Sequence, residues 1–155
     1  MKAVISNNMI QFLIDIDLPI RLACLFISDW PAVVSLWYVL TDEKIYCATQ
    51  SKAKIIRYLR RSSKCGFEIA GDSFPYRGIG YYGNASISKE KGKNIFRMLI
   101  QKYKRREISE LHKLSLSEKH LQNEVTVEIA QNTMFEWDDK ARMSDFVIMT
   151  IIMTA

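Results

Sequence analysis

The feature that most constrains this chain is a series of three apolar segments with very short connections between them. The segments are residues 22–27 (LACLFI), 33–39 (VVSLWYV) and 44–49 (KIYCAT), and they are rich in β-branched and aromatic residues, which favour strands. A parallel pair needs a crossover of a dozen or more residues, so these connections predict antiparallel neighbours. We therefore expect an antiparallel sheet, preceded by a short helix at residues 9–14.

Four further segments have the pattern of strands. Residues 66–71 and 79–87 read as two strands, with Gly83 at a bulge or at a close approach of another group. Val125, Val127 and Ile129 alternate with less apolar residues, which predicts a half-exposed strand, and residues 134–137 extend that sheet after a turn.

Two longer segments have helical spacing. Residues 51–61 carry a small apolar stripe, and residues 95–103 carry a wider one. The second helix is expected to start after Ser88, with Glu90 in its first turn, and to end in basic residues, the charge that a helix C-terminus prefers. Six or seven strands with two or three helices predict a mainly β (α+β) fold closed into a small barrel.

Length and charge set the class of protein. The 155 residues suit one domain covering 1–155. The net charge of +5 predicts a surface that attracts anions, whether nucleic acid, acidic lipid or a phosphorylated small molecule. The apolar tail within residues 144–155 is shorter than the ~20 residues of a membrane span.

The cysteines indicate the compartment. The chain has an odd number of cysteines, Cys24, Cys47 and Cys65, and no two of them form a CxxC pair. This pattern fits buried thiols in a reducing cytoplasm better than a disulfide framework or a zinc site. The N-terminal segment does not read as a signal peptide because acidic residues interrupt its apolar stretch. We expect a cytoplasmic protein without a membrane span.

The most informative segment for function is residues 49–54 (TQSKAK), where a strand is expected to end and a helix to begin. Ser51 suits the N-cap position. Lys52 and Lys54 would lie in the first helical turn, where a cation is unfavourable unless an anion is bound. An anion site would use these lysines with the Thr49 and Ser51 hydroxyls. The alternative is a solvated basic turn, since Arg57, Arg60, Arg61 and Lys64 continue the positive charge.

Other candidates are weaker when taken from the residues alone. Arg77 lies between Tyr76 and Gly78 after a strand, and a tight turn with an exposed arginine is the simpler interpretation. For Trp137, a place in the core is favoured over a ligand contact. His112 and His120 have no carboxylate spacing typical of a metal site, and the chain has no Ser-His-Asp, HExxH, Walker A or GxGxxG pattern.

Taken in order, these segments resemble a known family. The series RLACLFI, Trp30-Pro31, VVSLWYV, KIYCATQSKAKIIRYLRR, GFEIAG with PYRGIGYYGNASI, and NEVTVEIAQNTMFEWDDKARM resembles the pyridoxamine 5'-phosphate oxidase-like proteins, which are FMN-binding split β-barrels. The resemblance covers roughly residues 13–143. It implies a six-stranded antiparallel split β-barrel with flanking helices and a homodimer with FMN at the subunit interface.

The resemblance also implies roles for particular residues. The FMN phosphate would meet Thr49, Ser51, Lys52 and Lys54, which is the anion site expected from helix electrostatics. The isoalloxazine ring would lie along Val34, Ser35, Leu36 and Trp37, largely through backbone groups. Arg77 and Gly78 match a strand start that faces the cofactor, and Trp137 is a candidate from the second subunit.

The function implied is a flavin-dependent oxidoreductase with a small-molecule substrate. The positions that bind pyridoxamine phosphate in relatives have no clear match here, which argues against vitamin B6 oxidation. A deazaflavin or haem in the same fold is one alternative, and a basic nucleic-acid-binding module is another. The tail at 144–155 has no recognised counterpart, and its apolar run suits a dimer interface or a groove.

Overall fold

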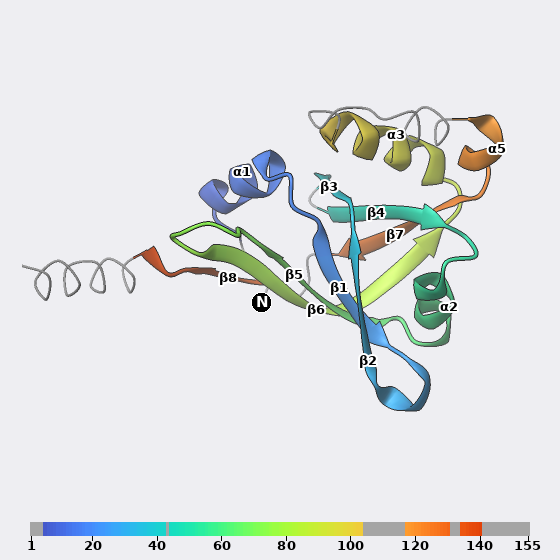
Figure 1. Cartoon of the computed structure of the whole chain (residues 1–155), viewed down its shortest axis with the longest axis horizontal. Helices are drawn as coiled ribbons and strands as arrows, with labels where there is room; N and C mark the ends of the chain where they lie inside the picture. Colours follow the sequence, from blue (N-terminus) through green and yellow to red (C-terminus); the bar gives the residue numbers. More distant parts are fainter. Residues whose placement is uncertain (1–4, 43, 104–116, 131–133, 141–155) are drawn as a thin grey trace, which may run out of the picture.

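The computed structural model describes residues 5–42, 44–103, 117–130 and 134–140 (Figure 1). Its strands form an antiparallel sheet in the order β2-β1-β5-β6-β7-β4-β3, with β8 paired to β6. The strands are β1 (Ile20–Leu25), β2 (Pro31–Leu36), β3 (Tyr38–Thr41), β4 (Lys44–Gln50), β5 (Lys64–Ala70), β6 (Arg77–Ser88), β7 (Glu124–Ala130) and β8 (Met134–Asp138). The expected mainly β split barrel is confirmed.

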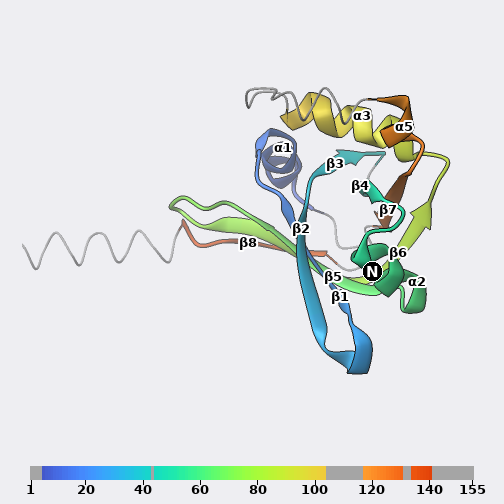
Figure 2. The same cartoon turned by 45° about the vertical axis from the view of Figure 1, so that its right-hand side comes forward.

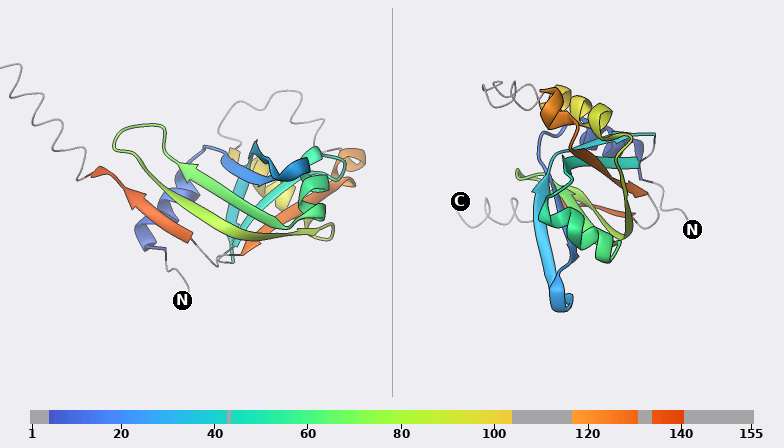
Figure 3. Two further views of the ribbon diagram at one scale, coloured as in Figure 1. Left: turned by 90° about the horizontal axis from the view of Figure 1, so that it is seen from below. Right: turned by 90° about the vertical axis from the view of Figure 1, so that its right-hand side faces the viewer.

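Strand β6 joins two halves of the sheet. Its residues 78–84 pair with β5 and residues 77–81 pair with β8, whereas residues 85–88 pair with β7. The first half, β2-β1-β5-β6-β8, is long and twisted, and the second half carries β7, β4 and β3 (Figures 1 and 2). Seen from below, the β5–β6–β8 ribbon extends beyond the rest of the barrel (Figure 3).

The segment predicted as one strand at residues 33–39 is interrupted at Trp37, so that prediction is wrong in its length. β2 ends at Leu36 and β3 begins at Tyr38. The Trp37 ring stacks on Tyr103, with ring centroids 4.8 Å apart and planes 8° apart. Since β2 pairs with β1 and β3 pairs with β4, the break is where the chain passes from one half of the sheet to the other.

Helices cover the barrel on three sides. They are α1 (Asn7–Asp15), α2 (Lys54–Arg61), α3 (Gly92–Tyr103) and the short α5 (Glu118–Leu121), with a 3-10 turn, η1 (Ile27–Asp29), between β1 and β2. Ser6 is the N-cap of α1, and its Oγ accepts from the Met9 amide at 3.3 Å. α3 begins at Gly92, so Glu90 precedes the helix and does not lie in its first turn, contrary to expectation.

The core has two parts. The larger fills the barrel and includes the α2 residues Ile55, Ile56 and Leu59. The smaller lies between α3 and the outer face of β3 and β4, and it contains Val39, Tyr46, Ile95, Leu99 and Tyr103. α3 also covers β7 (Figure 1), so the prediction of a half-exposed strand at 125–129 is wrong, and even Thr126 is buried.

Of the two alternatives predicted for Gly83, the structure shows a close approach of another group and not a bulge. The β5–β6 ladder runs without interruption through Cys65–Gly83. A Cβ at position 83 would collide with the Tyr81 hydroxyl, which donates to Asn84 O at 3.4 Å and accepts from the Asn84 amide at 3.1 Å. The Tyr81 ring folds back across its own strand, and glycine at position 83 leaves room for it.

No helix among the described residues is long and apolar enough to cross a membrane. Within the same residues, no group of three or more His, Cys, Asp or Glu side chains is arranged to hold a metal ion. His112, the basic residues 104–106 and the tail 144–155 lie outside the described part of the chain.

Candidate functional site

The corner between β4 and α2 carries the four residues expected to bind phosphate. Thr49 lies near the end of β4, and Ser51 and Lys52 form the turn that follows it. The Ser51 amide donates to Asn123 O at 2.8 Å, and the Ala53 amide donates to Gln50 O at 2.9 Å. These two bonds fix the path of the turn.

Ser51 is not the N-cap of α2, so this part of the prediction is wrong. The N-cap is Ala53, which offers no side-chain hydrogen bond, and Lys54 is the first helical residue. The physical reason is that the Ser51 amide continues the contacts between β4 and the segment before β7. The helix begins only after that bond is made. Lys54 thus lies in the first turn as expected, and Lys52 lies just before it.

The charges at this corner are unbalanced. Lys52 and Lys54 are exposed, and among the described residues neither forms an ion pair with a carboxylate. In the first turn of α2 the Ile56 amide donates to Ala53 O at 3.1 Å, whereas the two amides before it have no hydrogen-bond partner among the described residues, and this end of the helix carries partial positive charge. Thr49 and Ser51 are half-buried beside them. Two lysines, two hydroxyls and free amide groups make a site chemically suited to an anion.

The strand expected to hold the flavin ring lies beside this corner. β3 pairs with β4 only as far as Tyr38–Cys47, and extending that register by two residues places Leu36 level with Thr49. β2 and β4 are in contact. Among the described strands, β2 has one partner, β1, and residues 48–50 of β4 pair only with β7. Two strand edges without a partner among the described strands therefore lie near each other at a seam, which we define as residues 34–37 and 48–54.

The side chains of residues 34–37 have different environments. Val34 and Leu36 are half-buried and pack against the barrel core. Ser35 is exposed and lies opposite Arg21 of β1. Trp37 is held on Tyr103 by the ring contact described above. The backbone edge, more than these side chains, is what this strand presents at the seam.

Arg77, Gly78 and Trp137 lie together, but away from the seam of the same chain. Gly78 is opposite Trp137 in the β6–β8 ladder, and the Arg77 guanidinium lies 4.3 Å from the centre of the Phe12 ring on α1. β2 and β6 are three steps apart in the sheet, about 14 Å at the usual strand spacing. One chain therefore does not bring these residues to the expected ring site.

Arg77 also borders two cavities beneath α1. One, of about 1120 Å³, lies between α1 and the loop after β5 and includes Phe12, Asp72 and Asp138. The other, of about 240 Å³, includes Ser6, Glu136 and Trp137. Glu136 Oε2 accepts from both the amide and the hydroxyl of Ser6 at 3.1 Å, which attaches the start of α1 to β8.

One buried acid near the seam was not anticipated. Glu124 is 3% exposed; its Oε1 accepts from Gln50 Nε2, and among the described residues its Oε2 has no hydrogen-bond partner. Burial raises the pKa of this carboxyl, while the Gln50 hydrogen bond and nearby His120 oppose that shift. An acid at the start of an apolar strand was the available sequence signal, but the alternating pattern placed it on a solvated face.

Comparison with solved structures gives several that share the fold. The chain superposes on a conserved hypothetical protein of Mycobacterium tuberculosis with a TM-score of 0.70 and 22% identity, covering 88% of this chain and 87% of that one. It superposes on an F420 reductase with a TM-score of 0.66 and 15% identity, covering 81% of this chain and 94% of the reductase. It superposes on a provisionally named pyridoxamine 5'-phosphate oxidase of Listeria innocua with a TM-score of 0.62 and 14% identity, covering 83% of this chain and 95% of that one.

No protein-family model matches the chain, and no curated protein matches it. At these identities the likeness is one of fold. It agrees with the strand order, the division of the sheet at β6 and the helices that flank it. The chain therefore has the fold of the pyridoxamine 5'-phosphate oxidase-like split β-barrel proteins.

Proposed function

We propose that this chain is an FMN-binding flavoprotein with oxidoreductase activity towards a small molecule. The observation that carries the proposal is the seam, where the free edge of β2 meets a corner with two lysines that have no carboxylate partner among the described residues. A flat heteroaromatic ring with a phosphate on a flexible chain matches a strand edge next to an anion site. The fold shared with an FAD-binding protein of Mesorhizobium loti supports a flavin as the class of cofactor.

Each part of the seam has a distinct task in this proposal. Thr49, Ser51, Lys52 and Lys54 hold the phosphate, with charge-assisted hydrogen bonds from the lysines. The peptide groups of Val34, Ser35, Leu36 and Trp37 offer donors and acceptors to the edge of the ring. The bound flavin supplies the electron-transfer chemistry, and the protein orients it and excludes water.

We propose a homodimer in which Arg77, Gly78 and Trp137 of the second chain complete the site. Within one chain these three residues lie away from the seam. In the proposed dimer, the same residues of the second chain would lie beside it. The outer face of the long half-sheet supplies apolar surface for association. Val33, Ala23, Gly66 and Tyr82 follow one another in register across four strands, and Val33 and Tyr82 are 64% and 65% exposed.

The test of cofactor binding is a titration of the purified full chain with FMN and with riboflavin, followed by flavin fluorescence. If the lysine corner binds phosphate, FMN binds at least tenfold more tightly than riboflavin, about 1.4 kcal/mol, and the difference shrinks as salt is added. Equal affinities for the two flavins, or no uptake of FMN, would contradict the proposal.

The test of assembly is light scattering on wild type and on the Val33→Glu variant. A dimer formed through this face becomes a monomer in the variant, because burying an unpaired charge in an apolar contact is strongly unfavourable. If the second chain completes the site, FMN affinity falls together with dimerisation. A wild-type monomer that binds FMN normally would exclude the shared site while leaving FMN binding intact.

A deazaflavin is the second candidate cofactor, because an F420 reductase is among the structures that share this fold. Competition between FMN and a deazaflavin for the same protein distinguishes them. Haem receives less support from the described residues. The His120 carbonyl accepts from Gln50 of the seam at 3.4 Å, but the imidazole ring lies beside Phe96 of α3 and 3.8 Å from Glu124.

Nucleic-acid binding is tested by an oligonucleotide titration at two salt concentrations, since phosphate contacts weaken steeply with salt.

The described cysteines are all free and buried, which supports the proposed cytoplasmic location. They do not identify the substrate. A screen of reduced nicotinamides and small oxidants with the flavin-loaded protein is the experiment that assigns the reaction.

A further inference from the structure

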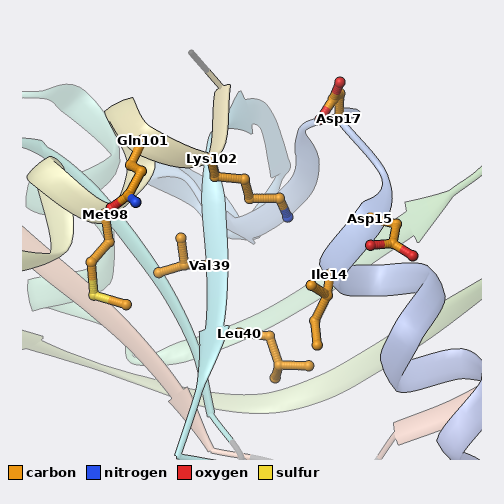
Figure 4. Close-up of a pocket in the computed structure, with 8 residues that line it drawn as sticks. All are labelled: Ile14, Asp15, Asp17, Val39, Leu40, Met98, Gln101 and Lys102. Carbon is orange, nitrogen blue, oxygen red and sulfur yellow. The ribbon is translucent and has the colours of Figure 1, made fainter. Parts of the chain in front are cut away.

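A further pocket lies between the end of α1, strand β3 and helix α3 (Figure 4). Its volume is about 330 Å³, and it is lined by Ile14, Asp15, Asp17, Val39, Leu40, Met98, Gln101 and Lys102. None of these residues belongs to the seam or to the group formed by Arg77, Gly78 and Trp137. Figure 4 shows the Lys102 side chain extending from α3 across β3 towards Asp15 and Asp17.

The Lys102 ammonium is held at a defined position. Its Nζ donates to Leu13 O at 3.0 Å and lies 3.7 Å from the centre of the Tyr38 ring. The same Leu13 oxygen accepts from the Tyr38 hydroxyl at 2.7 Å. Among the described residues, no carboxylate forms an ion pair with Lys102. The amine is thus oriented by a carbonyl and an aromatic face while remaining at the wall of a pocket.

The setting of this lysine differs from that of a surface lysine. Burial lowers the pKa of Lys102 to about 8, and Asp17, Asp15 and Cys47 partly oppose that shift. A lysine in this range has a substantial neutral fraction near neutral pH, which is the form that attacks carbonyl carbon. A cleft with a perturbed amine is the usual setting of such chemistry.

We propose that Lys102 is the reactive amine of a second ligand site, which takes a short uncharged aliphatic aldehyde as a reversible imine. The neutral amine attacks the carbonyl carbon and forms a C–N bond, while the carbonyl oxygen takes up a proton. The resulting carbinolamine then loses water to give a protonated imine. The overall step consumes one amine, one aldehyde and one proton, releases one water, and involves no oxidation or reduction.

The groups around Nζ suit the product as well as the reactant. A protonated imine keeps one N–H, which can retain the hydrogen bond to Leu13 O, and its positive charge remains over the Tyr38 ring. Asp15 and Asp17 favour that charge and offer carboxylates for proton transfer during loss of water. Ile14, Leu40 and Met98 provide the apolar surface for a short carbon chain, and the two acids disfavour an aldehyde that carries a carboxylate.

The experiment uses the unmodified full-length protein. It is incubated at pH 7 with butanal and cyanoborohydride, which reduces an imine to a stable secondary amine, and each lysine is then quantified by peptide mass spectrometry. Lys93, on the same helix and paired with Glu118 at 3.1 Å, is the internal reference. We expect Lys102 to be alkylated about tenfold faster than Lys93, because its pKa lies well below the ordinary lysine value.

Two further measurements separate the site from general reactivity. Raising the pH to 10 is expected to abolish the advantage of Lys102, since surface lysines then become neutral as well. Succinic semialdehyde is expected to react more slowly than butanal at Lys102 but not at Lys64, which is exposed and has no carboxylate partner among the described residues. The Asp15→Asn, Asp17→Asn double variant is expected to lose that discrimination while retaining the wild-type circular dichroism spectrum.

The proposal is overturned if Lys102 is alkylated at pH 7 no faster than Lys93. The assigned preference for uncharged aldehydes is overturned if the double variant discriminates between the two aldehydes as strongly as wild type. Neither result depends on flavin, so both can be read whether or not the chain binds FMN.

Discussion

Gly78 on β6 lies directly opposite Trp137 on β8, and a Cβ at position 78 would come within 2.8 Å of the indole ring. The same Cβ would lie 2.9 Å from the Ala70 Cα, so backbone as well as side chain surrounds this position. Trp137 therefore covers the start of β6 only because residue 78 has no side chain. The two residues act as one packing unit at the end of the long half-sheet.

The first prediction is that Gly78→Ala destabilises the fold by about 1–3 kcal/mol, the usual cost of overpacking. The measurement is the free energy of unfolding from a urea titration. Gly71→Ala is the matched control, because its Cβ would meet Phe12 at an ordinary 3.6 Å. That variant is expected to lie within about 0.5 kcal/mol of wild type, and equal losses in both variants would contradict the packing described.

The second prediction concerns two glutamates on β7 that respond oppositely to the same change. Glu124→Gln is expected to stabilise the protein by about 1 kcal/mol at pH 7, because it removes a buried charge and keeps an acceptor for Gln50. Glu128→Gln is expected to destabilise it by about 0.5 kcal/mol, because Glu128 pairs with Lys44 and with Lys91. Urea titrations of both variants and wild type measure these differences.

The pH dependence of these two variants has a defined sign. The pKa of Glu124 is raised by burial, so the folded protein binds that proton more tightly and loses stability as pH rises through the folded pKa. The pKa of Glu128 is lowered by the Lys44 hydrogen bond, so its contribution is present above the unfolded pKa and is lost as pH falls. Both differences from wild type are therefore expected to shrink on acidification from pH 7 to pH 4, and a difference that grows would be inconsistent with either environment.

The third prediction tests the phosphate corner. The Ser51→Ala, Lys54→Ala double variant is expected to weaken FMN binding at least tenfold, because it removes a hydroxyl and a charge from the corner. Riboflavin binding is expected to change little. Lys64→Ala, at the start of β5 and exposed, alters the net charge at a different place and is the control. If it weakens FMN binding as much as the double variant does, the effect is one of general charge and not of a phosphate site.

The fourth prediction concerns the thiols. Cys24, Cys47 and Cys65 are free and buried, and burial raises the pKa of Cys47 to about 12 and that of Cys65 to about 11. A thiol-specific disulfide reagent at pH 8 is expected to react slowly with the native protein and rapidly with all three thiols in guanidinium, since the thiolate is the reactive form. Rapid reaction of a thiol in the native state would show that its burial is incomplete.

Much of the fold could be predicted because local patterns decided it. Short connections fixed the antiparallel start of the sheet, and helical spacing located α2 and α3 within a few residues. The break at Trp37 could not be predicted from 33–39, whose composition is uniformly favourable to a strand. It arises from the contact of Trp37 with Tyr103, which is remote in sequence.

The candidate site was predicted in part. The position of Lys54 in the first turn of α2 followed from helix periodicity, whereas the N-cap depended on a bond from Ser51 to Asn123 that only the folded sheet creates. Lys102 shows the same limit. The sequence predicts only a basic end of this helix, whereas in the structure Lys102 is half-buried and donates to the Leu13 carbonyl of α1.

The division of β6 between two partners has a mechanical consequence. Because the strand is hydrogen-bonded to β5 before residue 85 and to β7 after it, the two half-sheets cannot rotate apart about this strand without breaking one of these ladders. Among the described residues, the backbone crosses the seam at Trp37, where β2 passes to β3, and no strand spans it as β6 spans the other side. Any opening motion of the barrel is thus confined to the side where the proposed cofactor enters.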